Sequence, residues 1–185
     1  MKVQFAAVLF AIWAVLLIVT FPPITQAGQL DREDRIFKGE LPEMSKLMKW
    51  LEHATPEDVK WADFNLKLGH RAIARGQWSA ATKAFAGAAM DRPTPRTLLN
   101  LAVASANMRR SGTCKEEVEA RLRTVRHAFT YFDAGLEMHK ILGSKSDLDH
   151  GSIIDFHKKM LDAQKRLLDF QRKCFGLAKT ERGRQ

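Results

Sequence analysis

Apolar residues recur at helical spacing through most of this chain of 185 residues. Their steps of three and four residues predict amphipathic helices separated by short polar turns. In chain order the expected helices are 42–53, 55–74, 78–90, 95–108, 114–142 and 153–174. Six prolines, a single tyrosine and few β-branched runs also argue against a sheet. We therefore expect an all-α fold of about six helices after an N-terminal signal segment.

Two of these helices carry small residues at regular spacing on either side of a tight turn, Arg75-Gly76-Gln77. A glycine at position 76 suits a reversal that needs positive φ, and a proline ends the second helix because it lacks an N–H. Small side chains let two helix axes approach closely, and a phenylalanine fills the space beside them. The residues expected at this contact are Leu68, Gly69, Gly76, Ala81, Phe85, Ala88 and Pro93.

These seven residues fall in register with the tetratricopeptide (TPR) pattern, so residues 62–95 resemble one TPR of about 34 residues. The segment departs from the family at Asn65 and Ala72, where the pattern has Trp and Tyr. The segment from Pro95 resembles a degenerate second repeat. The resemblance implies stacked antiparallel helical hairpins. An ordinary helical hairpin with small contact residues is the alternative.

In the TPR family the inner helices line a concave groove that holds an extended peptide. The residues that the resemblance places on this side are Asn65, His70, Ile73, Asn100, Ser105 and Met108. Among them Asn65 and Asn100 carry amides suited to a peptide backbone. The resemblance thus implies a non-catalytic module that binds a peptide or protein partner.

Residues 1–27 have the pattern of a targeting segment. Lys2 precedes an apolar run at 5–21, and Thr25-Gln26-Ala27 offers small residues for signal peptidase. We expect cleavage after Ala27, with an uncleaved inner-membrane anchor through residues 5–21 as the alternative. Both place the remainder outside the cytoplasm, as a periplasmic, secreted or anchored protein of the cell envelope. Three further parts are expected, namely a linker at 28–41, a helical domain at 42–178 and a disordered basic tail at 179–185.

The two cysteines open one long helix and close the next, and each helix is expected to carry one apolar stripe. The stripes are Cys114, Val118, Leu122, Val125, Phe129, Phe132 and Leu136, and Ile153, Phe156, Met160, Ala163, Leu167, Phe170 and Cys174. If the chain folds back between 142 and 153, Cys114 and Cys174 come to the same end of an antiparallel pair. An exported chain meets oxidising conditions, so we predict a structural disulfide. Two buried thiols are the alternative.

The net charge of +9 is unevenly distributed. Residues 28–63 hold nine acidic and six basic residues, whereas residues 64–185 hold twelve acidic and 23 basic ones. A basic body suggests an anionic partner, so binding to anionic lipid or polysaccharide is the alternative function. Export argues against nucleic acid, and no aromatic residues alternate with the basic ones as single-strand binding requires.

The sequence offers little support for catalysis or for a cofactor. It has no GxSxG, no glycine-rich phosphate loop and no HExxH or EF-hand spacing. The residues that invite a metal hypothesis are His139, His150, His157, Asp147, Asp149 and Asp155. We interpret these acids as solvated loop residues and expect no catalytic residue and no metal, with a metal in the loop as the remaining alternative.

Overall fold

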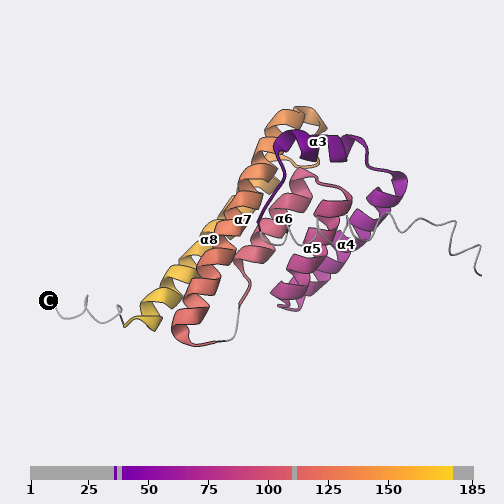
Figure 1. Cartoon of the computed structure of the whole chain (residues 1–185). Coiled ribbons are helices and arrows are strands. Elements are labelled where there is room, and N and C mark those ends of the chain that lie inside the picture. Colours follow the sequence, from indigo (N-terminus) through magenta and orange to yellow (C-terminus); the bar gives the residue numbers. More distant parts are fainter. Residues whose placement is uncertain (1–35, 37–38, 110–111, 177–185) are drawn as a thin grey trace, which may run out of the picture. The chain divides into compact units, whose positions relative to one another are not determined.

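Six α-helices and one 3₁₀ turn make up the secondary structure of the described residues, which include no strand (Figure 1). The computed structural model describes residues 36, 39–109 and 112–176. The elements are α3 (Met44–Glu52), α4 (Pro56–Ala74), α5 (Trp78–Asp91), α6 (Pro95–Ala106), α7 (Cys114–Leu142), η1 (Gly143–Lys145) and α8 (His150–Cys174). The expected all-α fold of about six helices is confirmed. The predicted leader at 1–27 and tail at 179–185 lie outside the described residues.

Side-chain caps fix where the long helices begin. Thr55, Thr94 and Thr113 each accept a hydrogen bond from the backbone N–H three residues later, and the side chain of that later residue accepts one from the backbone N–H of the cap. The start expected for α8, at residue 153, was wrong. Asp149 is the cap instead, accepting from the Ser152 N–H at 2.6 Å, so α8 begins at His150.

Each helix from α4 to α7 packs against the next one along the chain, and α8 packs against both α6 and α7 (Figure 1). This arrangement leaves α6 in the middle. Every residue of α6 from Pro95 to Ser105 is buried except Arg96. The Thr94 cap and Pro95 are buried too, because the start of this helix is covered by its neighbours.

The contact between α4 and α5 depends on a glycine. Gly69 and Ala72 are buried on α4, opposite Ala81 and Phe85, which are fully buried on α5. Ala88 and Pro93 are buried as well, and Gly76 takes φ +70° in the turn. Leu68 was also expected in this contact, but its side chain is 37% exposed. The contact face of α4 is centred on Gly69, and the adjacent residue points about 100° away from it.

Helix α7 has two packed faces where the sequence suggested one stripe. Gly135 faces α6 so closely that a Cβ there would stand 2.9 Å from Leu99 Cδ2. Val118, Val125 and Phe132, from the expected stripe, are also buried. Leu122 belongs to the same stripe by spacing but is 42% exposed. A helix with neighbours on two sides buries a wider arc than a single heptad stripe describes.

Part of the expected linker at 28–41 belongs to the core. Ile36 is 1% exposed, and its carbonyl accepts a hydrogen bond from the hydroxyl of Tyr131 in α7. Gly39, with φ +79°, lies against His127, and a Cβ at position 39 would stand 2.7 Å from its ring. The folded domain therefore begins before residue 42. The linker interpretation failed because one isoleucine among charged residues shows no periodicity.

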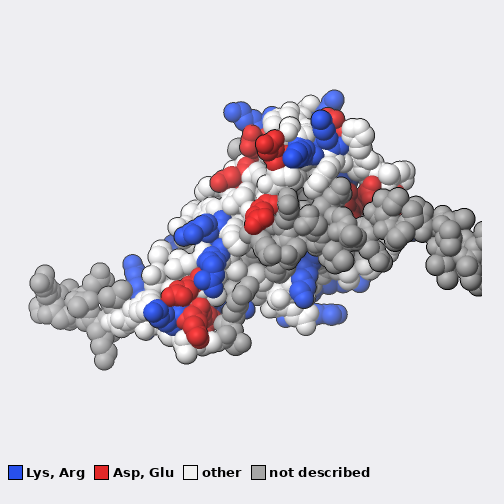
Figure 2. All heavy atoms as spheres, in the orientation of Figure 1, with Lys and Arg blue, Asp and Glu red and all other residues white. Residues whose placement is uncertain are grey.

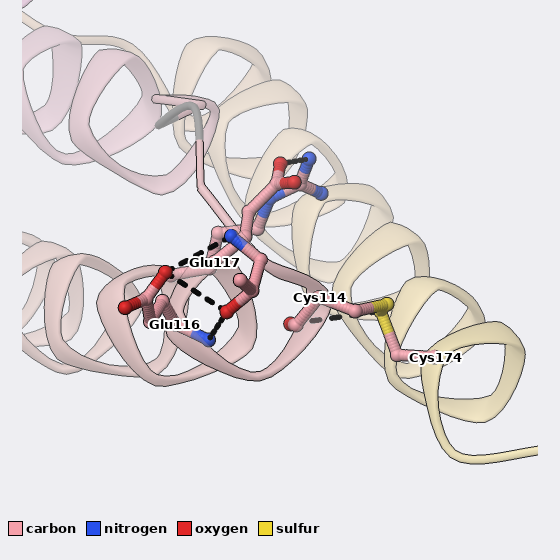
Figure 3. Close-up of a disulfide and its surroundings, with 6 residues drawn as sticks. Cys114, Glu116, Glu117 and Cys174 are labelled. Atoms are coloured by element: carbon pink, nitrogen blue, oxygen red, sulfur yellow. Dashed lines mark hydrogen bonds and ion pairs between the residues drawn. A yellow bond between two sulfur atoms is a disulfide. The ribbon is translucent and has the colours of Figure 1, made fainter.

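A disulfide joins the first residue of α7 to the last residue of α8 (Figure 3). Cys114 and Cys174 have their Cα atoms 5.6 Å apart, 60 residues apart in sequence. The predicted pairing is confirmed, and α7 and α8 are antiparallel, as their matching stripes indicated. In the same turn Thr113 caps α7 through Glu116, and Glu117 pairs with Arg121.

Candidate functional site

Three adjoining hollows share the side chain of Trp78, the first residue of α5. Their volumes are about 240, 320 and 580 Å³. Their walls come from α4, the start of α5, the end of α6, the first half of α7 and one side of α8. We call these three hollows together the Trp78 groove.

The hollow of about 240 Å³ lies between α4, α6 and α8. His70 and Ile73 come from α4, and Phe156 and Lys159 come from α8. The His70 ring meets the ring of Phe85 edge-on, with centroids 5.3 Å apart. Burial lowers the pKa of His70, and the nearby charges of Arg96 and Lys159 lower it further. The imidazole is therefore neutral at pH 7.

The hollow of about 320 Å³ is lined by three arginines, Arg109, Arg121 and Arg166. The guanidinium of Arg121 lies 4.0 Å from the centre of the Phe170 ring and pairs with Glu117 through one terminal nitrogen. Its Nε is buried and has no hydrogen-bond partner among the described residues. A buried guanidinium N–H without an acceptor is costly, so Arg121 carries an unpaired donor beside this hollow.

A hydrogen bond connects the end of α6 to α8 at the boundary between these two hollows. Arg166 donates to Asn107 Oδ1 at 2.7 Å, and Asn107 donates to the Val103 carbonyl at 2.8 Å. Both Asn107 and Arg166 line both hollows. The amide thus holds Arg166 in place and leaves the remaining N–H groups of its guanidinium for another acceptor.

The third hollow, about 580 Å³, is shallower and lies at the turn between α4 and α5. Gly76 to Ala80 form its floor, and Lys83 and Arg109 stand beside them. Arg109 also lines the arginine hollow, so the two hollows share this side chain.

The charge of the Trp78 groove is strongly positive. Its lining includes Lys83, Arg109, Arg121, Lys159 and Arg166 but only one carboxylate, that of Asp162. By contrast, acidic and basic side chains are interspersed over the face drawn in Figure 2.

The structure places the six expected groove residues in different environments. His70, Ile73 and Met108 line the groove. Ser105 is 3% exposed in the core. Asn100 borders the first hollow but is 5% exposed, and its amide donates to the Arg96 carbonyl at 2.9 Å.

Asn65 is half-buried, and its amide donates to Asp91 Oδ2 at 3.0 Å. Each asparagine thus already uses one amide N–H within the protein, and the expectation that the two grip a peptide backbone stays a prediction. Both amides lie on the contact side of a helix and form hydrogen bonds within the protein. The pattern of residue types does not reveal such bonds.

Sequence reasoning missed the residues that dominate the groove. Trp78 and Asn107 were assigned only to the ends of expected helices, and Arg109, Arg121 and Arg166 were counted only within the basic excess of residues 64–185. No periodic signal identifies them, since they converge from α5, α6, α7 and α8. A tryptophan directly after the turn of the hairpin was the one available indication.

Four of the six residues that invited a metal hypothesis bond to other groups of the protein. His139 hydrogen-bonds Ser146, Asp149 caps α8 and Asp155 pairs with Lys159. Asp147 receives the backbone N–H of Arg96 at 3.2 Å. In the part of the chain that the structure describes, no three His, Cys, Asp or Glu side chains are grouped so that they could hold a metal ion.

Comparison with protein-family models, curated proteins and solved structures finds no match to this chain. None of the described helices combines the length and the apolar content needed to cross a membrane.

Proposed function

We propose that this chain is an exported, non-catalytic interaction module, and that the Trp78 groove binds an extended peptide or protein segment bearing carboxylates. The proposal combines the resemblance to TPR proteins with the shape and charge of the groove. In this view α4 with α5 and α6 with α7 are the two repeats, α4 and α6 are their inner helices, and α8 closes the stack.

The observation that carries the proposal is the arginine hollow. Arg121 presents a buried Nε without an acceptor, and Arg109 and Arg166 stand around the same 320 Å³. A guanidinium matches a carboxylate through parallel N–H donors. Glu117 already pairs with a terminal nitrogen of Arg121, so an incoming carboxylate would meet chiefly Arg109 and Arg166.

The rest of the groove suits the flanking part of such a segment. Trp78, Ile73 and Phe156 supply apolar surface between the charged side chains. The neutral His70 offers both a donor and an acceptor to a peptide backbone. A mostly apolar wall with a few convergent polar groups is the usual composition of a binding pocket.

A display library of random 12-residue peptides tests the proposal without assuming the natural partner. The immobilised protein should enrich peptides that contain Asp or Glu next to an apolar residue. The variant Arg109→Gln/Arg166→Gln removes two positive charges from the groove and should lose this enrichment.

The variant Arg123→Gln/Arg126→Gln provides the matched control. It removes two exposed arginines of α7 that line none of the three hollows, and it should enrich the same peptides as the native protein. Enrichment of neutral or basic peptides by the native protein, or equal loss in both variants, would contradict the proposed function.

A further inference from the structure

The outer side of α8 carries a regular row of exposed apolar side chains. Ile154, Leu161, Leu168 and Phe175 follow one another at intervals of seven residues and are 59, 50, 48 and 51% exposed. A spacing of seven residues returns to nearly the same side of a helix. The row extends over about 32 Å at 1.5 Å per residue.

Basic residues alternate with the apolar ones on the same side. Lys158, Lys165 and Arg172 each come four residues after an apolar member of the row, and all three are exposed. A step of four residues turns the helix by only 40°. We call these seven residues the α8 outer stripe.

The α8 outer stripe lies opposite the packed side of the helix. Phe156, Met160, Ala163 and Leu167 are buried against the rest of the domain, about half a turn from the stripe. Lys159 and Arg166, which line the Trp78 groove, occupy a third side between the two. Asp155, Asp162 and Asp169 lie between the basic residues of the stripe and the groove side.

We propose that the α8 outer stripe is a docking surface for an anionic phospholipid bilayer, with the helix axis parallel to the membrane plane. A row of large apolar side chains with lysines and arginines beside them is typical of helices that lie at a membrane interface. The long basic side chains reach the phosphate groups while their stems and the apolar residues enter the headgroup region. The Trp78 groove, a quarter to a third of a turn away, stays open to water.

A second copy of this chain fits the stripe less well. Pairing two α8 helices through their apolar rows would bring Lys158, Lys165 and Arg172 of one copy against the same residues of the other. Like charges facing each other along a helical interface are destabilising. An anionic surface neutralises them instead.

The test uses the full chain reconstituted with vesicles and a photo-cross-linker at the middle of the stripe. Leu161→p-benzoylphenylalanine is irradiated with vesicles of phosphatidylcholine alone or of phosphatidylcholine and phosphatidylglycerol at about 3:1. Mass spectrometry of the α8 peptide then measures lipid adducts. We expect a yield at least about fivefold higher with the anionic vesicles, since each basic residue near such a surface contributes about that factor. The N-terminal segment is the same in both arms, so the comparison isolates the stripe.

Two charge variants identify the residues responsible. Lys158→Gln/Lys165→Gln/Arg172→Gln should reduce the yield on anionic vesicles to that on phosphatidylcholine. Lys60→Gln/Lys67→Gln/Arg71→Gln removes the same charge from exposed positions of α4 and should leave the yield within about twofold, because screened charges elsewhere contribute little.

A cross-linker on α7 serves as the positional control. Ile141→p-benzoylphenylalanine, at a position 53% exposed outside the stripe, should give few lipid adducts on either vesicle. Equal yields from Leu161 on both vesicles, equal adducts from Ile141, or cross-links from Leu161 to a second copy or to residues 1–35 would each overturn the proposal.

Discussion

The backbone of Gly69 lies directly against the ring of Phe85, so that a Cβ at position 69 would stand 2.6 Å from the ring atoms Cδ1 and Cζ. Phe85 is fully buried in the same contact. The close contact between Gly69 and Phe85 sets the distance between α4 and α5. It therefore sets the position of His70 and Ile73 on the wall of the Trp78 groove.

Gly69→Ala should lower the free energy of unfolding by about 2 kcal/mol, because overpacking outweighs the gain in helix propensity. Urea unfolding followed by circular dichroism measures the change. In a Phe85→Leu background the smaller side chain makes room, so the same substitution should have less than half of this effect. An equal effect in both backgrounds would contradict the assigned contact.

The disulfide between Cys114 and Cys174 should contribute about 4 kcal/mol, because it closes a loop of 60 residues in the unfolded chain. Thermal unfolding with and without dithiothreitol should show this difference in the native protein. Cys114→Ser/Cys174→Ser should unfold like the reduced protein and should not respond to dithiothreitol. A reductant effect that persists in this variant would have to come from another source.

Tyr131 is the chain's single tyrosine, so its titration can be followed by absorbance near 295 nm without interference. Burial raises its pKa to about 12, partly offset by the hydrogen bond from the Gly39 N–H. We expect the tyrosinate signal to appear near pH 12 in the folded protein and near pH 10 in urea.

The raised pKa has a consequence for stability with a definite sign. The stabilisation tied to the neutral phenol is complete below pH 10 and is lost as the pH rises from about 10 to about 12, since the unfolded chain releases the proton first. Unfolding free energies of the native protein and of Tyr131→Phe should therefore converge over this range. A native titration midpoint near 10 would mean that the phenol is not buried.

Ile36 tests whether the domain begins before residue 42. Ile36→Ala removes a side chain that is 1% exposed, and it should lower the free energy of unfolding by about 3 kcal/mol. Leu122→Ala, at a position 42% exposed on α7, should change it by less than about 0.5 kcal/mol. A similarly small effect of Ile36→Ala would mean that Ile36 belongs to the linker and not to the folded domain.

The fold was largely predictable from sequence because its signals are local. The hydroxyl and proline at Thr55-Pro56 and Thr94-Pro95 start helices through contacts within four residues. The glycine at position 76 ends a helix by its own φ of +70°. The disulfide followed from two helices of similar length and the turn between them. Each of these inferences needed only a short segment or a simple reversal of the chain.

The groove was not predictable in the same way. Whether Asn100 faces solvent or donates to the Arg96 carbonyl depends on how α6 is covered by α5, α7 and α8. Arg121 became a groove residue because α8 brings Phe170 under its guanidinium. Ile36 is buried beside Tyr131, 95 residues further along the chain, whose hydroxyl donates a hydrogen bond to the Ile36 carbonyl. Such pairings are set by tertiary packing, which periodicity along one chain does not encode.

The most direct test of the central claim is a coupling measurement between the groove and its ligand. One peptide enriched by the display library is titrated, by fluorescence polarisation, against the native protein and Arg109→Gln/Arg166→Gln, each with the original peptide and with its acidic residue changed to the amide. Charged hydrogen bonds predict that either change alone weakens binding by at least about tenfold. We expect both changes together to weaken it hardly more than either alone, because they remove the same contact. Strictly additive losses, or native affinity in the arginine variant, would contradict a carboxylate held in the Trp78 groove.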